Sequence, residues 1–133
     1  CALPIFVIAS HGEFCVGLKG TTEMFTGEIE NCEVAPLRPG VSAEEYDGIL
    51  EAAIDKVDDG SGVIVLTDLK GGTPYNRSAG LVFKGKNIKV ATGMNLPMLM
   101  SIVFDDRSNG KIDEIFDNAL NEAGNGIDQI AIG

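Results

Sequence analysis

The sequence predicts an α/β fold: a doubly wound, mostly parallel sheet of about four strands with helices on both faces. Two observations support this prediction. Apolar runs without alternating polar residues, at Leu3–Ala9 and Val63–Leu66, are typical of strands buried on both faces. Each run ends in a short polar or glycine-rich turn, and a segment with helical spacing follows. At 133 residues the chain has the usual length of one domain, and we expect a single domain over residues 1–133.

Three elements are expected between these two strands. A helix over Glu13–Phe25 should pack closely on the sheet, because glycines interrupt its apolar pattern. Its packed apolar residues are expected to be Phe14, Val16, Leu18, Met24 and Phe25. A strand over Cys32–Pro36 should lie at an edge of the sheet, because it contains a proline. The capping box Ser42–Glu45 then opens a helix, in which apolar residues recur at helical spacing from Tyr46 to Val57.

The second half of the chain continues to alternate helices with strands. A helix is expected over Thr73–Lys84, with its threonine as the N-cap and the following proline as the first helical residue. A fourth strand is expected over Lys86–Thr92, and the turn after it leads into a helix over Met98–Phe104. A last amphipathic helix, Asp113–Ala123, is ended by the glycines that follow it. Ile127–Ile132 forms a strand-compatible tail.

Charge and composition disfavour several classes of protein. The 20 acidic residues outnumber the 10 basic ones and give a net charge of −10, which argues against binding to nucleic acid or to an anionic membrane. No apolar stretch approaches the roughly 20 residues that span a bilayer, and no basic segment precedes the first apolar run as in a signal peptide. Cys1, Cys15 and Cys32 form no paired motif and are expected to be reduced thiols of a cytosolic protein.

Polar or glycine-rich turns follow three of the expected strands, at residues 10–12, 67–73 and 93–95. If the first and third strands are neighbours, right-handed crossovers place His11, the single histidine, opposite Asp68 at one edge of the sheet. A carboxylate that accepts a hydrogen bond from one imidazole nitrogen fixes the tautomer and leaves the other nitrogen free as a nucleophile or base. Gly71 and Gly72 let the backbone approach a ligand closely, and the helix that begins at Thr73 offers N–H groups to an anion.

A histidine, an orienting carboxylate and an anion cradle are the parts of a phosphohistidine site. In the alternative interpretation, Asp68 and Thr73 only cap the helix that follows, and spacing alone leaves both interpretations open. A metal site at His11 and Cys15 would lack the further ligands of a typical zinc shell, so no metal is expected. The sequence contains neither a P-loop nor a G-x-G-x-x-G motif, so nucleotide binding has no support.

The same residues resemble a known family, the IIA components of the mannose-family sugar phosphotransferase system. The most specific fragments are Asp68–Asn76 (DLKGGTPYN) and Gly93–Leu99 (GMNLPML), together with Ser10-His11-Gly12 at the end of the first strand. Further fragments in the same order are Glu23-Met24, Gly27-Glu28, Glu30-Asn31 and Pro39-Gly40. The resemblance extends over almost the whole chain.

This resemblance implies a cytosolic phosphocarrier, a phosphotransferase component that works through a phosphohistidine intermediate. His11 would accept a phosphoryl group from phospho-HPr and pass it to a histidine or cysteine of a IIB component during sugar uptake. By position, Asp68 would orient this histidine, and Thr73 would contact the phosphoryl oxygens beside Gly71 and Gly72. No cofactor is implied, and any contact with a membrane would be indirect, through the IIB, IIC and IID permease.

Two positions depart from the family pattern. Ser10 replaces a threonine that is common there, which should be harmless. Glu13 places an acidic group beside the active histidine, where it would repel a phosphoryl group unless it points away. The resemblance also favours a homodimer, in which the tail Ile127–Ile132 lies antiparallel on the sheet of the partner chain. We expect no fused IIB domain within these residues.

Three other functions stay open at this point. A related phosphocarrier subunit that serves dihydroxyacetone kinase would use the same chemistry with a different acceptor. In IIA-like regulatory modules of transcriptional activators, phosphorylation is a signal and not a relay. A small-ligand binding domain would use His11 to contact an anion without chemistry, and only this last function predicts no phosphorylation by phospho-HPr.

Overall fold

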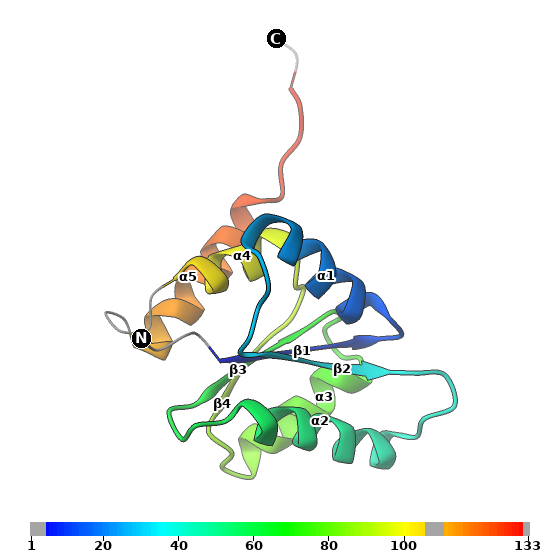
Figure 1. The fold of residues 1–133 in the computed structure, drawn as a ribbon. Coiled ribbons are helices and arrows are strands. Elements are labelled where there is room, and N and C mark those ends of the chain that lie inside the picture. Colours follow the sequence, from blue (N-terminus) through cyan, green and yellow to red (C-terminus); the bar gives the residue numbers. More distant parts are fainter. Residues whose placement is uncertain (1–4, 106–110, 132–133) are drawn as a thin grey trace.

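The computed structural model describes residues 5–105 and 111–131. A four-stranded parallel sheet forms the middle layer, in the order β2-β1-β3-β4 (Figure 1). The strands are β1 (Phe6–His11), β2 (Cys32–Leu37), β3 (Val63–Thr67) and β4 (Ile88–Ala91). The two strands with unbroken apolar sequences, β1 and β3, are neighbours in the middle of the sheet, as the sequence predicts. β2, which contains the proline, lies at an edge.

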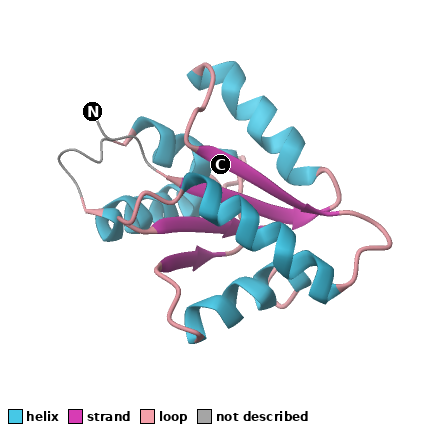
Figure 2. Cartoon of the chain, turned by 60° about the horizontal axis from the view of Figure 1, so that its bottom comes forward, coloured by secondary structure: helices cyan, strands magenta, loops and turns pink. Residues whose placement is uncertain are grey.

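Helices cover both faces of this sheet (Figures 1 and 2). One face carries α1 (Phe14–Thr26), α4 (Leu96–Phe104) and α5 (Ile112–Asn125). The other face carries α2 (Ala43–Val57) and α3 (Thr73–Phe83). The predicted doubly wound α/β fold is confirmed. Within the described residues, no helix has both the length and the apolar character needed to cross a membrane.

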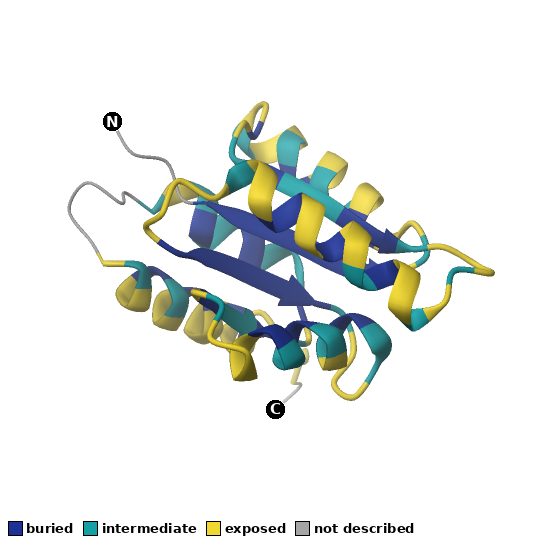
Figure 3. Cartoon of the chain, turned by 90° about the horizontal axis from the view of Figure 1, so that it is seen from below, coloured by how far each residue is buried: buried dark blue, intermediate teal, exposed yellow. Residues whose placement is uncertain are grey.

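The core consists of two apolar layers, one on each face of the sheet. Side chains alternate along a strand, so β1 contributes Phe6 and Ile8 to one layer and Val7 and Ala9 to the other. All four are at most 1% exposed, which explains why the strand contains no alternating polar residues. In Figure 3 the buried strands lie between helices whose outer faces are exposed.

The packed face of α1 differs from the prediction. Cys15 and Thr22 are fully buried, and Leu18 is partly buried against the core. Thr22 can be buried because its hydroxyl donates a hydrogen bond to the Leu18 carbonyl oxygen at 2.7 Å. Small side chains therefore bring α1 close to the sheet, and the large apolar residues are left outside. The wrongly predicted, exposed residues are Phe14, Val16, Met24 and Phe25.

The C-terminal segment also differs from the prediction. α5 continues through Asn125, and Gly126 is its C-cap. Residues 127–131 then project from the body without joining the sheet (Figure 1), and Ile127 and Ile130 are 79% and 96% exposed. The predicted strand therefore does not form over residues 127–131 of a single chain, and Ile132, its last residue, lies outside the described residues. Its exchange between two chains remains a prediction.

Cys15 and Cys32 are free thiols in the core, and Cys1 lies outside the described residues. Burial raises the pKa of both core thiols, that of Cys32 to about 12, so neither is a thiolate at neutral pH. We expect iodoacetamide to leave both unmodified in the folded protein at neutral pH, and to alkylate both once denaturant has unfolded it. Peptide mass spectrometry measures this difference. Rapid alkylation of Cys32 in the folded protein would contradict the prediction.

Candidate active site

The carboxyl ends of β1 and β3 lie side by side, and both carry residues of the predicted site. β1 pairs with β3 as far as Ala9 opposite Thr67, and with β2 as far as His11 opposite Leu37. β1 therefore continues past the end that the sequence predicts and terminates at His11, while Asp68 follows β3 directly. In this strand order, the boundary between β1 and β3 is the topological switch point, where open α/β sheets bind their ligands.

His11 and Asp68 are in direct contact. The Asp68 Oδ2 atom lies 2.9 Å from His11 Nδ1 and 3.0 Å from the His11 backbone nitrogen. A carboxylate oxygen can only accept a hydrogen bond, which assigns the proton of the neutral imidazole to Nδ1 and leaves Nε2 with a free electron pair. The imidazole side chain is 45% exposed and that of Asp68 is 14% exposed. The carboxylate thus lies behind a ring that solvent or a partner can reach.

The second carboxylate oxygen of Asp68 has a different environment. Oδ1 is buried and has no hydrogen-bond partner among the described residues. A buried polar atom without a partner is unfavourable, and more so when it carries charge. Asp68 Oδ1 lies on the same carboxylate whose other oxygen contacts the His11 ring.

Two adjacent glycines shape the loop between β3 and α3 for different reasons. Gly72 has an extended backbone, with φ −77° and ψ 168°. A Cβ atom at this position would lie 2.5 Å from Cε1 and 3.2 Å from Nε2 of His11, so only glycine leaves room for the imidazole. Gly71 has a φ of +83°, a left-handed conformation that other residues rarely adopt. The sequence predicts that the backbone of this loop approaches a ligand closely. In the structure, the group that it approaches is the His11 imidazole.

The start of α3 differs from the prediction by one residue. Gly72 is the N-cap and Thr73 is the first helical residue, because the loop stays extended up to its contact with His11. No side chain caps this helix, and Asp68 bonds to His11 instead. The interpretation in which Asp68 and Thr73 serve only as helix caps is therefore wrong.

Several polar groups at the start of α3 remain available to an anion. Among the described residues, the backbone N–H groups of Thr73 and Tyr75 and the Thr73 hydroxyl have no hydrogen-bond partner. The side chain of Asn76 donates a hydrogen bond to the Gly71 carbonyl oxygen at 2.9 Å and holds the loop against the first turn. In the sequence, only its place within the 68–76 fragment marks Asn76 as a candidate site residue. A helix N-terminus with free N–H groups attracts anions.

The two residues that depart from the family pattern are both accommodated. Ser10 is fully buried, and its Oγ accepts a hydrogen bond from the Cys15 N–H at 2.8 Å, so the hydroxyl ties the end of β1 to α1. The Glu13 carboxylate is paired with Arg38, with Oε1 2.7 Å from Nε and Oε2 3.4 Å from Nη2. Arg38 follows β2 directly, and no motif in the sequence marks it as a site residue.

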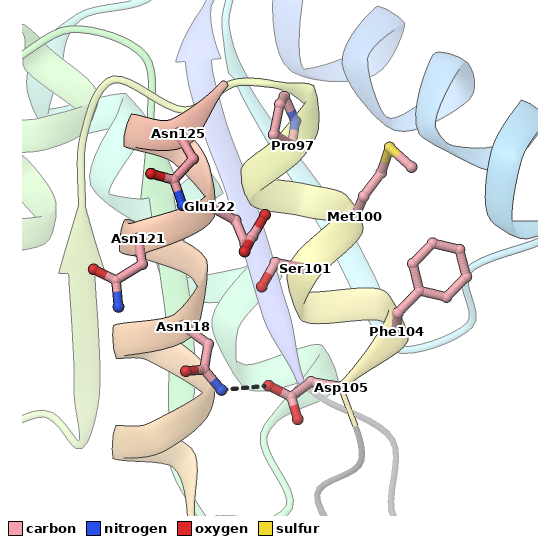
Figure 4. Close-up of a pocket in the computed structure, with 9 residues that line it drawn as sticks. All are labelled: Pro97, Met100, Ser101, Phe104, Asp105, Asn118, Asn121, Glu122 and Asn125. Carbon is pink, nitrogen blue, oxygen red and sulfur yellow. Dashed lines mark hydrogen bonds between the residues drawn. The ribbon is translucent and has the colours of Figure 1, made fainter. Parts of the chain in front are cut away.

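The third polar turn, at 93–95, lies beside the end of β3, because the Met94 N–H donates a hydrogen bond to the Thr67 carbonyl oxygen at 3.0 Å; among the described residues, no hydrogen bond joins it to His11 or Asp68. Met94 is buried, and Asn95 accepts a hydrogen bond from the Met98 N–H and donates one to the Ala123 carbonyl oxygen, both at 3.0 Å. The Asn95 side chain therefore caps α4 and links its start to α5. A wide hollow of about 940 Å³ lies between these two helices (Figure 4), and none of its lining residues belongs to the predicted site. No group of three or more potential metal ligands occurs in the part of the chain that the structure describes.

The fold and the site together define a class of protein: a doubly wound α/β domain with an accessible, carboxylate-oriented histidine at its topological switch point. Comparison with known families identifies a family of this class. Residues 5–120 match the family described as "PTS system fructose IIA component", and the chain belongs to this family.

Individual relatives agree with this assignment. The fructose-specific EIIA component of Bacillus subtilis is 30% identical over 97 residues, which cover 73% of this chain and 66% of the relative. The mannose-specific EIIAB component of Escherichia coli K12 is 31% identical over 121 residues, or 91% of this chain and 38% of the relative. The chain thus spans less than two thirds of either protein. The crystal structure of EIIA from Streptococcus agalactiae superposes with a TM-score of 0.85 at 31% identity, covering 96% of this chain and 97% of that one.

Proposed function

We propose that this chain is a cytoplasmic phosphocarrier of a sugar phosphotransferase system. It accepts a phosphoryl group from phospho-HPr on Nε2 of His11 and passes it to a IIB component. The observation that carries this proposal is the 2.9 Å contact between Asp68 Oδ2 and His11 Nδ1, because it leaves Nε2 as a free nucleophile. Relatives named for fructose, mannose and sorbose favour sugar uptake over a kinase-linked or regulatory role.

The proposed transfer requires no separate proton acceptor. Nε2 attacks phosphorus, and a nitrogen–phosphorus bond forms as the bond from phosphorus to the donor breaks, with its electron pair returning to the donor. Because Nδ1 keeps its proton, the neutral ring of His11 becomes positively charged. The Asp68 carboxylate, whose Oδ1 is buried without a partner among the described residues, stabilises this charge. Transfer to the IIB component reverses the same steps.

The oxygens of the phosphoryl group would meet the free groups at the start of α3. The Thr73 hydroxyl and the N–H groups of Thr73 and Tyr75 can donate hydrogen bonds to them, beside Gly71 and Gly72. Phosphoryl transfer depends mainly on positioning and charge stabilisation. These backbone and side-chain donors supply both.

Incubation of the chain with phospho-HPr, followed by intact mass measurement, tests the proposal. We expect one phosphoryl group per chain, lost in acid and retained in base, as for a phosphoramidate. Onward transfer to a IIB component identifies a relay, and a stable phosphoprotein that no IIB component discharges would indicate a regulatory module. Absence of any phosphorylation would leave anion binding without chemistry as the function.

Gly72→Ala tests the close packing between the loop and the imidazole. The added methyl group would displace the ring, and a displacement of about 1 Å can lower a transfer rate by about 100-fold. The measurement is the initial rate of phosphorylation by phospho-HPr. Gly80→Ala is the matched control, because nothing lies within 4 Å of a methyl group added in that part of α3. Equal rates for the two variants would show that the ring position does not limit transfer.

We also propose a homodimer built by exchange of the C-terminal tail. The apolar side chains of Ile127 and Ile130 are exposed in the single chain, and β4 is an edge strand with one side free for pairing. Truncation after Gly124 removes the tail and should lower the dimer fraction in sedimentation equilibrium. A full-length chain that sediments as a monomer at micromolar concentration would rule out the exchange.

A further inference from the structure

The ion pair between Glu13 and Arg38 lies at the same edge of the sheet as His11. The Gly12 N–H donates a hydrogen bond to the Leu37 carbonyl oxygen at 2.8 Å, which fixes the end of β2 beside the end of β1. Neighbouring strands are about 4.8 Å apart, so the long side chain of Arg38 starts one strand away from His11. Asp68 contacts the histidine from the opposite side, that of β3.

The pair is not needed for the helix that Glu13 precedes. Glu13 is the N-cap residue of α1, but its side chain makes no capping hydrogen bond. The Ser10 hydroxyl accepts the Cys15 N–H in its place. The side chains of Arg38 and Glu13 are 57% and 62% exposed, and an exposed ion pair contributes little to stability. Arg38 can therefore leave Glu13 at little cost to the fold.

Phosphorylation of His11 changes the charge balance at this edge. A phosphoryl group brings about two negative charges to a site that already contains Asp68 and Glu13. The chain as a whole carries a net charge of −10. A guanidinium binds a phosphoryl group with two parallel hydrogen bonds, and the doubly charged group competes well against one exposed carboxylate.

We propose that Arg38 exchanges partners when His11 is phosphorylated, leaving Glu13 and binding the phosphoryl oxygens. Arg38 is then a phosphoryl-binding residue, and Glu13 is a positioning residue that holds the guanidinium beside the empty site. Competition between Glu13 and the phosphoryl group limits the stability of the phosphohistidine. A carrier benefits from this limit because it must also release the group. This inference rests on the proposed phosphocarrier function.

The test measures the equilibrium constant for phosphoryl exchange between phospho-HPr and the chain. We expect Arg38→Gln to lower this constant about tenfold, the effect of one charge-assisted hydrogen bond. Glu13→Gln should raise it, and most of that increase should disappear in the double variant. The equilibrium constant does not depend on how tightly the donor docks, so a role of Arg38 in docking alone would leave it unchanged. Lys86→Gln is the matched control, because Lys86 pairs with Asp55 at 2.8 Å, away from His11.

Each other outcome is decisive. An unchanged constant in Arg38→Gln, with the wild-type chain phosphorylated normally on His11, overturns this inference and leaves the proposed function intact. A tenfold decrease in Lys70→Gln and none in Arg38→Gln would assign the phosphoryl group to the exposed lysine after β3 and also overturn it. If Glu13→Gln raises the equilibrium constant by the same factor with and without Arg38, then Glu13 acts by direct repulsion of the phosphoryl group and does not position Arg38. A wild-type chain that is never phosphorylated removes both proposals.

Discussion

His11→Ala is expected to abolish phosphorylation by phospho-HPr completely. His11 is the single histidine of the chain, so no second imidazole can accept the group. Its ring is 45% exposed and lies outside both core layers, so its removal should leave the fold intact. The measurement is incorporation of one phosphoryl group by intact mass, together with circular dichroism to verify folding.

The label itself provides a second check on this variant. A phosphoryl group on nitrogen is labile in acid and stable in base, whereas a phosphoserine or phosphothreonine would survive acid. Acid-stable label on both the wild type and His11→Ala would point to a hydroxyl such as that of Thr73. Any incorporation that His11→Ala retains at the wild-type level would refute the assignment of the site.

Asp68→Asn is expected to slow phosphoryl transfer by roughly 100-fold or more, the usual effect of removing one preorganised electrostatic partner. The amide can still accept the hydrogen bond from the His11 backbone N–H, so the end of β1 should stay in place. It carries no charge to balance the developing positive ring, and it can also stabilise the wrong tautomer by donating to Nδ1.

The rate should be measured under single-turnover conditions with phospho-HPr, because this isolates transfer from donor recycling. Asp113→Asn is a suitable control: it also converts an aspartate to an amide, and Asp113 pairs with Lys89 at the surface, far along the chain from the site. Wild-type transfer by a folded Asp68→Asn variant would restrict Asp68 to a structural role.

The part of the site that follows from strand order, His11 beside Asp68, could be predicted from the sequence. His11 and Asp68 are 57 positions apart in sequence, but each follows an unbroken apolar run. Two such runs are both expected near the middle of a parallel sheet, and right-handed crossovers then bring their carboxyl ends to one edge. That argument does not reach Arg38, because β2 has a mixed pattern and an ion pair leaves no periodic signal. For Gly72 the sequence predicts only a close approach of the backbone to a ligand, whereas in the structure the close neighbour is the His11 imidazole.

The packed face of α1 shows a second limit. Large apolar residues predict burial only on average, because much of a folded protein's surface is apolar. Here Met24 is 84% exposed, whereas Thr22 is fully buried with its hydroxyl bonded within the helix. Helical spacing predicts the helix correctly. Which of its residues face the sheet depends on the space between the helix and the sheet.

The sequence by itself determined the α/β class, the order of the elements and the histidine and aspartate of the candidate site. Each of these follows from patterns within a few residues: unbroken apolar runs, the Ser42 cap and polar turns at strand ends. Only the tertiary structure decided that Gly72 touches the imidazole, that Asp68 does not cap α3 and that Arg38 holds Glu13. These contacts join residues from different strands and loops. They depend on register and on the space between packed elements, which local patterns do not encode.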